Sequence, residues 1–239
     1  RATRRRRLSV KFAPQARARL AHVPTRRSLL AALTGLASAP ASHADIVIDA
    51  PAARSSAAIR YWPVVTARED WNVVSAAPDC LRLRCFSAPR PVSRLDNPTR
   101  RHVGVDLFAR AGDAVVAIED GRILNFYPFL RASTGEMSYA LIVGHVGYVA
   151  NYGEIRVTSL RDRGLSVGDV VQGGTEIGEI SDTRQLHFET YTPSATRNSA
   201  WRYQDARPAR VLDPTPLLLD LAAHGRRLLP GETAIAEPQ

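Results

Sequence analysis

The stretch Arg101-His102-Val103-Gly104-Val105-Asp106 places a histidine and an aspartate four residues apart, with a glycine between them. Imidazole nitrogen and carboxylate oxygen are both ligands that zinc accepts. In a straight strand, residues four apart are separated by ~13 Å, which is too far for one ion with bonds of ~2 Å. A shared ion therefore requires a bend at Val103-Gly104-Val105, which Gly104 permits. The alternative is an ordinary strand whose polar ends happen to be His102 and Asp106.

A second polar cluster, Gln185-Leu186-His187-Phe188-Glu189, lies far downstream. Strand alternation would put Gln185, His187 and Glu189 on one face. Combining the two clusters predicts a single zinc ion held by His102, Asp106 and His187. Three protein ligands leave one coordination position open, and an open position is typical of catalytic rather than structural zinc.

The chain between and around these clusters predicts a mainly β fold, with a small twisted antiparallel sheet. Short β-branched and aromatic runs are punctuated by glycine and aspartate, as in a meander of strands. These runs are residues 114–118, 122–127, 139–145 and 147–152. One short C-terminal helix is expected over residues 217–224, since Asp213 and Pro214 precede it and Gly225 follows it.

Charge is distributed unevenly along the 239 residues, whose formal net charge is +9. Residues 1–44 contain ten basic residues and no acidic ones, which leaves 22 basic and 23 acidic residues in 45–239. The body of the protein therefore has no electrostatic reason to bind nucleic acid. It also contains no lysine, which excludes a lipoyl or biotinyl carrier despite two similar Gly-Asp turns at residues 112–113 and 168–169.

The basic segment, residues 1–44, is expected to be an export signal. Arg26 and Arg27 precede an apolar run too short to span a bilayer, and small residues follow before Asp45. This order resembles a twin-arginine signal and predicts a bacterial periplasmic or cell-envelope protein. An organelle transit peptide is the alternative. Residues 1–22 are interpreted as an upstream over-extension.

The rest of the chain is expected to divide into three parts. Residues 45–97 are predicted to be a linker and irregular N-terminal segment, in which Cys80 and Cys85 would form a disulfide in an oxidising compartment. Residues 98–192 form the β domain, and residues 193–239 form an extension carrying the helix. No stretch of the mature chain is long and apolar enough to span a membrane.

With both clusters placed, residues 98–192 resemble the lysostaphin/LytM-type zinc metallopeptidases, which cut peptidoglycan cross-links. His102-Val103-Gly104-Val105-Asp106 is similar to the family's H-x-G-x-D stretch, and residues 185–189 stand where the family has H-L-H-F-E. The strand 141–145 and the glycine turns follow in the family's order. The resemblance implies that His102, Asp106 and His187 bind one zinc ion and that the substrate is a peptidoglycan peptide.

The chain departs from the family at two non-ligand histidines, whose positions are held by Gln185 and Glu154. A carboxylate can act as general base, and an amide can donate a hydrogen bond to an oxyanion. We therefore predict exchanged roles, with Glu154 as the base and Gln185 as the oxyanion donor in a zinc-dependent endopeptidase. The alternative is a non-catalytic exported protein that binds peptidoglycan or activates an amidase.

Overall fold

The computed structural model describes residues 59–71, 84–90, 100–202 and 205–234. The expected export signal, residues 1–44, lies outside these ranges, as does Cys80. Cys85 is disulfide-bonded. Among the described residues, no helix has the length and apolar character needed to cross a membrane.

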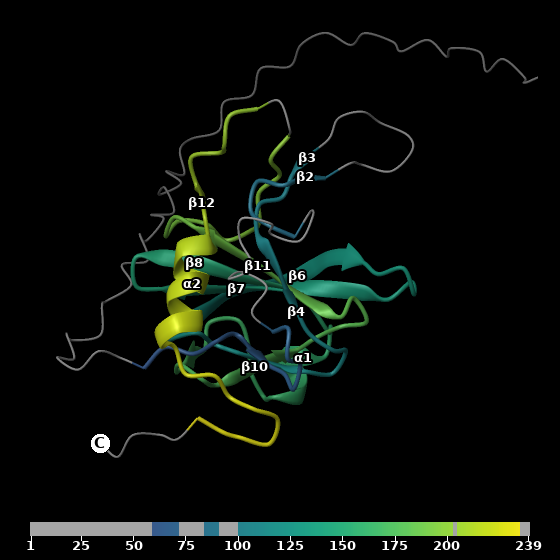
Figure 1. Ribbon diagram of the computed structural model, residues 1–239, viewed down its shortest axis with the longest axis vertical. Helices are drawn as coiled ribbons and strands as arrows, with labels where there is room; N and C mark the ends of the chain where they lie inside the picture. Colours follow the sequence, from purple (N-terminus) through teal and green to yellow (C-terminus); the bar gives the residue numbers. More distant parts are fainter. Residues whose placement is uncertain (1–58, 72–83, 91–99, 203–204, 235–239) are drawn as a thin grey trace, which may run out of the picture. The chain divides into compact units, whose positions relative to one another are not determined.

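The protein is mainly β, as the sequence predicts, and its largest sheet has seven antiparallel strands (Figure 1). The strand order is β12-β11-β8-β7-β6-β9, and β4 pairs with β11 beside β12. The strands of this sheet are β4 (Val105–Phe108), β6 (Gly121–Arg131), β7 (Met137–His145), β8 (Tyr148–Ile155), β9 (Val170–Val171), β11 (Gln185–Tyr191) and β12 (Val211–Leu212).

Two smaller sheets accompany the large one. The first has the order β1-β5-β10, formed by β1 (Val64–Val65), β5 (Ala114–Val116) and β10 (Glu176–Glu179). The second is a two-stranded ribbon of β2 (Pro89–Arg90) and β3 (Arg100–Arg101). The ribbon ends next to His102, so it places the segment before the β domain beside the first candidate ligand.

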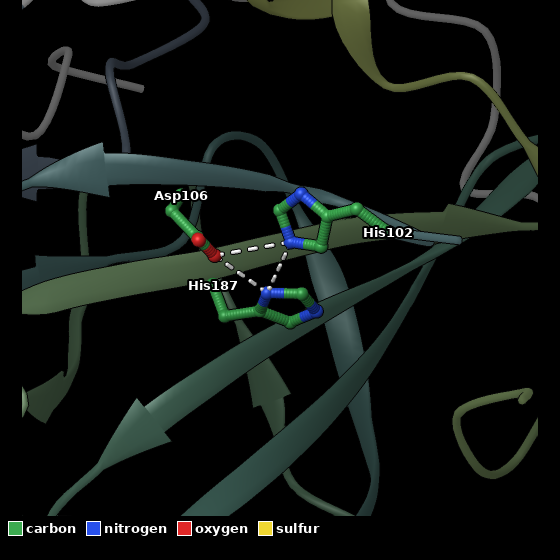
Figure 2. Close-up of side chains that lie close together, drawn as sticks. All are labelled: His102, Asp106 and His187. Atoms are coloured by element: carbon green, nitrogen blue, oxygen red, sulfur yellow. Dashed lines mark hydrogen bonds and ion pairs between the residues drawn. The ribbon is translucent and has the colours of Figure 1, made fainter. Parts of the chain in front are cut away.

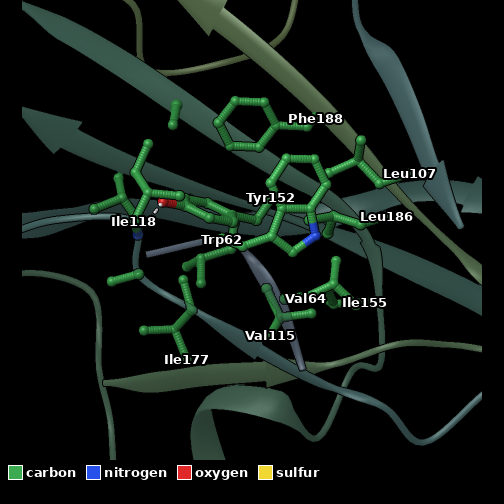
Figure 3. Packing of buried hydrophobic residues seen from close by; sticks show 14 of the residues in the cluster. Trp62, Val64, Leu107, Val115, Ile118, Tyr152, Ile155, Ile177, Leu186 and Phe188 are labelled. Carbon is green, nitrogen blue, oxygen red and sulfur yellow. Dashed lines mark hydrogen bonds between the residues drawn. The ribbon is translucent and has the colours of Figure 1, made fainter. Parts of the chain in front are cut away.

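The central strands are buried on both faces, and strand alternation divides their side chains between two clusters. In β7, Leu141 and Val143 belong to the main hydrophobic cluster, whereas Ala140 and Ile142 belong to the second. In β11, Leu186 and Phe188 point into the main cluster, which Figure 3 shows around Trp62 and Tyr152. Gln185, His187 and Glu189 therefore lie on the opposite face, as period-2 alternation predicts.

Part of the segment predicted to be irregular, residues 45–97, packs into this core. Trp62 is 1% exposed and Val64 is fully buried, and Val64 pairs with Val115 of β5. The Trp62 ring meets Trp71 edge-on at 4.9 Å between centroids. Residues 59–71 thus contribute apolar surface to the same fold as the β domain. The domain boundaries themselves stay a prediction.

Two helices are present in the described residues, α1 (Ser159–Asp162) and α2 (Thr215–His224). The second is the predicted C-terminal helix. Asp213 Oδ1 accepts the Thr215 N–H at 2.8 Å, which satisfies one of the unpaired donors of the first turn. Leu218 and Leu221 are buried in the main cluster, so the helix is attached to the sheet by its apolar face.

Candidate metal centre

The three predicted ligands come together on two paired strands and the turn before one of them. Asp106 of β4 and His187 of β11 are direct antiparallel partners, and cross-strand partners have Cβ atoms ~5 Å apart. His102 follows β3, and the strand is interrupted at residues 102–104 before β4 begins. The chain therefore bends where the shared-ion hypothesis requires it.

Gly104 is needed in this bend because β11 passes very close to it. A Cβ atom added at Gly104 would lie 2.4 Å from the carbonyl oxygen of Phe188 and 2.8 Å from Cγ of Glu189. The sequence argument invoked the conformational freedom of glycine, but the structural reason is the close approach of a neighbouring backbone.

The ligand atoms form a nearly equilateral triangle (Figure 2). Asp106 Oδ1 lies 2.8 Å from His187 Nδ1 and 3.1 Å from His102 Nε2, and the two ring nitrogens are 3.0 Å apart. A tetrahedral ion with bonds of ~2.0 Å separates its ligand atoms by ~3.3 Å, so a small outward movement of these atoms would admit zinc. All three side chains are buried, with 1–7% exposure.

Hydrogen bonds at the outer sides of the rings orient both histidines toward the centre. His102 Nδ1 lies 2.8 Å from the carbonyl oxygen of Cys85, and His187 Nε2 lies 2.8 Å from Glu189 Oε1. Each outer nitrogen must carry a proton to donate to its oxygen partner. Neutral rings then present lone pairs at His102 Nε2 and His187 Nδ1, beside the carboxylate oxygen of Asp106. Three acceptors directed at one point suit a cation.

The pKa shifts of the three residues also indicate that the buried carboxylates favour a positive charge in the cluster. Burial lowers the pKa of His102, although the neighbouring Asp106 carboxylate acts to raise it by favouring the protonated ring. Burial alone would raise the pKa of Asp106, but hydrogen bonds to both histidines hold it well below its ordinary value. Burial likewise opposes protonation of His187, yet the nearby carboxylates of Glu189 and Asp106 raise its pKa to about 10. A proton on His187 therefore supplies part of the charge that a metal would bring.

Glu189, to which the sequence interpretation assigned no role, orients His187. Its fully buried carboxylate lies beside His187 Nε2 and also accepts hydrogen bonds from Asn151 Nδ2 at 2.5 Å and Tyr191 Oη at 2.6 Å. A carboxylate behind a ligating histidine fixes the tautomer and the ring orientation. Period-2 alternation from His187 would have identified Glu189, whereas nothing in the sequence pointed to Asn151.

Glu154 reaches the same region through an irregularity in β8. Tyr139 pairs with Ile155 and Ala140 pairs with Gly153, so Glu154 is the extra residue of a β-bulge. Its φ of +69° is unusual for a residue with a side chain. Burial raises the pKa of Glu154.

Gln185 and Glu154, the two predicted catalytic residues, contact each other. Gln185 Nε2 donates to Glu154 Oε1 at 3.1 Å, and Arg84 Nη1 donates to Gln185 Oε1 at 2.7 Å. Glu154 Oε2 is buried and makes no hydrogen bond of ordinary geometry among the described residues, although the Thr183 hydroxyl acts to lower the pKa of Glu154. One carboxylate oxygen is thus held in place, while the other has a free lone pair.

A pocket of about 210 Å³ connects these groups. Its lining includes two of the predicted ligands, His102 and His187, together with Glu154, Gln185 and Glu189. The remaining lining residues are Arg90, Arg100, Arg101, Val103, Phe129, Leu130, Asn198, Ser199, Ala200 and Trp201.

Residues 84–90 belong to the site, which the sequence interpretation did not anticipate. The carbonyl oxygen of Arg84 accepts the Asp106 N–H at 2.9 Å, and that of Cys85 contacts His102 as described above. Arg90 Nη2 lies 2.8 Å from His102 Nε2 and also hydrogen-bonds to Asp106 Oδ2. These contacts join residues distant in sequence through strands of two residues, for which periodicity gives no signal.

Fold and site together define a mainly β protein with a buried His-Asp-His cluster of the kind that holds one metal ion. Residues 100–199 match the model of Peptidase family M23. This match agrees with the resemblance of the β domain to lysostaphin/LytM-type zinc metallopeptidases.

Three solved structures illustrate what this chain is similar to. LytU is 18% identical over 56% of this chain and 80% of its own, with a TM-score of 0.38. The catalytic domain of lysostaphin from Staphylococcus simulans is 23% identical over 56% of this chain and 89% of its own, with a TM-score of 0.36. A zinc-containing peptidase from Vibrio cholerae is 22% identical over 52% of this chain and 40% of its own, with a TM-score of 0.33. No curated protein sequence matches the chain.

Proposed function

We propose that the protein is an exported, zinc-dependent endopeptidase that hydrolyses peptide bonds in peptidoglycan cross-links. The observation that carries this proposal is the convergence of His102 Nε2, Asp106 Oδ1 and His187 Nδ1 within 3.1 Å of one another. The match of residues 100–199 to the model of a peptidase family supports the reaction class. The substrate and the cellular compartment are inferred from the family and from the predicted export signal.

The residues around the cluster divide the chemistry among them. His102, Asp106 and His187 would hold the ion, which when bound would polarise the peptide carbonyl and acidify a water molecule. Glu154 would take the proton from that water, because its Oε2 is unpaired and burial raises its pKa toward the operating range of a base. Gln185 would donate one hydrogen of its amide group to the developing oxyanion, while the second hydrogen of the same group stays bonded to Glu154 Oε1.

The test combines zinc content with release of peptides from purified peptidoglycan. The wild type should release cross-link fragments, and a chelator should abolish release until zinc is restored. Glu154→Gln should lower the rate by a factor of ~10² to 10⁴ with unchanged zinc content. Glu179→Gln, which makes the same change at a surface ion pair with Arg156, is the control and should retain full activity. Full activity of Glu154→Gln would refute its assignment as the base.

A second candidate, a non-catalytic peptidoglycan-binding or amidase-activating protein, is favoured by one observation. Gln185 is bonded on both sides, to Arg84 and to Glu154, and such a closed pair can be a purely structural arrangement. A wild-type protein that contains one zinc ion, binds peptidoglycan and releases no fragments would establish this candidate and refute the endopeptidase.

A further inference from the structure

Arg90 is positioned by the β2–β3 ribbon against the candidate metal ligands. Its ladder partner is Arg100, and the ribbon continues through the His102 N–H, which donates to the carbonyl oxygen of Ala88 at 2.8 Å. The Arg90 side chain is 25% exposed, whereas that of Asp106, its ion-pair partner, is 2% exposed. The guanidinium therefore bridges the pocket and the buried ligand cluster.

One contact of Arg90 uses an atom that a metal would need, His102 Nε2, and the other is made to Asp106 Oδ2. Because His102 Nδ1 carries a proton for the carbonyl oxygen of Cys85, His102 Nε2 has a single lone pair. Arg90 Nη2 occupies that lone pair at 2.8 Å. One nitrogen lone pair cannot accept from a guanidinium and coordinate an ion simultaneously, so metal binding requires Arg90 to leave His102.

The hydrogen-bonding groups of the Arg90 side chain are also incompletely satisfied. Its Nε is buried and lacks a hydrogen-bond partner among the described residues, which is costly for a charged donor. Arg90 is thus attracted by the unpaired negative charge of the cluster rather than fully accommodated by its surroundings. A divalent cation at the same place would remove that attraction and repel the guanidinium.

We propose that Arg90 competes with a metal ion for His102 and Asp106 and thereby lowers the apparent metal affinity of the cluster. The inference rests on the proposed ligand set but not on catalysis, because it concerns the binding equilibrium alone. When a binding-competent state is only fractionally populated, apparent affinity falls by that fraction. Removal of Arg90 should therefore tighten zinc binding while leaving the metal-free cluster less well compensated.

The experiment measures zinc affinity of the full chain by competition with a chromophoric chelator at fixed pH and salt, and Tm with and without zinc. Arg90→Gln and Arg90→Ala should each bind zinc about tenfold or more tightly than the wild type. Their metal-free Tm should fall and their zinc-induced rise in Tm should increase. Arg100→Gln removes the same charge from the opposite strand, and screening should limit its effect to less than about threefold.

The outcomes separate this proposal from the proposed function. Unchanged or weaker zinc binding by both Arg90 variants would overturn it and would indicate that Arg90 orients Asp106 as a ligand. An equal gain in Arg100→Gln would overturn it in favour of general electrostatics. If neither the wild type nor any variant binds zinc, or if His187→Ala binds zinc as tightly as the wild type, the proposed ligand set itself would be overturned. Wild-type zinc binding without peptidoglycan cleavage would refute only the endopeptidase proposal.

Discussion

Replacing Glu189 by glutamine should weaken metal binding without removing any ligand. The fully buried carboxylate faces three groups that act as donors, namely His187 Nε2 at 2.8 Å, Asn151 Nδ2 at 2.5 Å and Tyr191 Oη at 2.6 Å. A glutamine side chain keeps the shape but directs an N–H₂ group at one of these donors. If that donor is His187, the ring proton moves to Nδ1 and the metal loses a lone pair.

The magnitude follows from the hydrogen bonds that are lost. A hydrogen bond to a charged group contributes ~1.5–3 kcal/mol, and glutamine keeps some of the three, so the unfolding free energy should fall by ~2–4 kcal/mol. Loss of a group that orients a ligating histidine typically costs ~10- to 100-fold in metal affinity. The same range is expected for zinc binding to Glu189→Gln.

Chelator competition measures the affinity, and urea unfolding of the metal-free protein measures the stability. Circular dichroism should first establish that the variant is folded at the assay temperature. Glu179→Gln again provides the matched control, because Glu179 pairs with Arg156 at 26% side-chain exposure. Zinc affinity of Glu189→Gln within twofold of the wild type would show that Glu189 does not orient His187.

Two further predictions concern Gly104, in the bend between His102 and Asp106, and His145, the last residue of β7. Gly104→Ala should lower the unfolding free energy by ~1–3 kcal/mol and weaken zinc binding, because the new Cβ would lie 2.4 Å from the Phe188 carbonyl oxygen; unchanged urea unfolding would contradict this. Burial lowers the pKa of His145 below its ordinary 6.5, despite the opposing hydrogen bond to the Asp120 carbonyl. The unfolded state therefore binds more protons below about pH 6.5, so this contribution to stability is complete above that pH and is lost as the pH falls toward the lowered pKa. His145→Gln should show a smaller difference in unfolding free energy between about pH 7.5 and pH 5.5, and an unaltered difference would refute the assignment.

The sequence was sufficient for the fold class and for the grouping of His102, Asp106 and His187. Strand periodicity is local, and it predicts that His187 and Glu189 lie on one face of β11. The bend at Gly104 followed from the reach of a strand compared with the length of a metal bond. Both arguments depend on short-range geometry. Neither brings His187 to His102 and Asp106, which lie far upstream in the sequence, so combining the two clusters was a separate hypothesis.

The contributions of Arg84, Cys85 and Arg90 could not be predicted in the same way. They depend on β2 and β3, each of two residues, and strands of this length show no alternation. The bulge at Glu154 was equally hidden, since it arises from the register between β7 and β8 rather than from any residue preference at that position. Long-range register is decided by packing of the whole sheet.

Charge compensation explains why the cluster can be stable in two states. Asp106 and Glu189 are buried carboxylates, and buried charges require partners of opposite sign. The partners in this structure are a proton on His187, whose pKa is raised to about 10, and the guanidinium of Arg90. A divalent ion that displaces the proton and Arg90 exchanges two positive charges for two. If a divalent ion binds as proposed, the buried carboxylates would therefore remain neutralised.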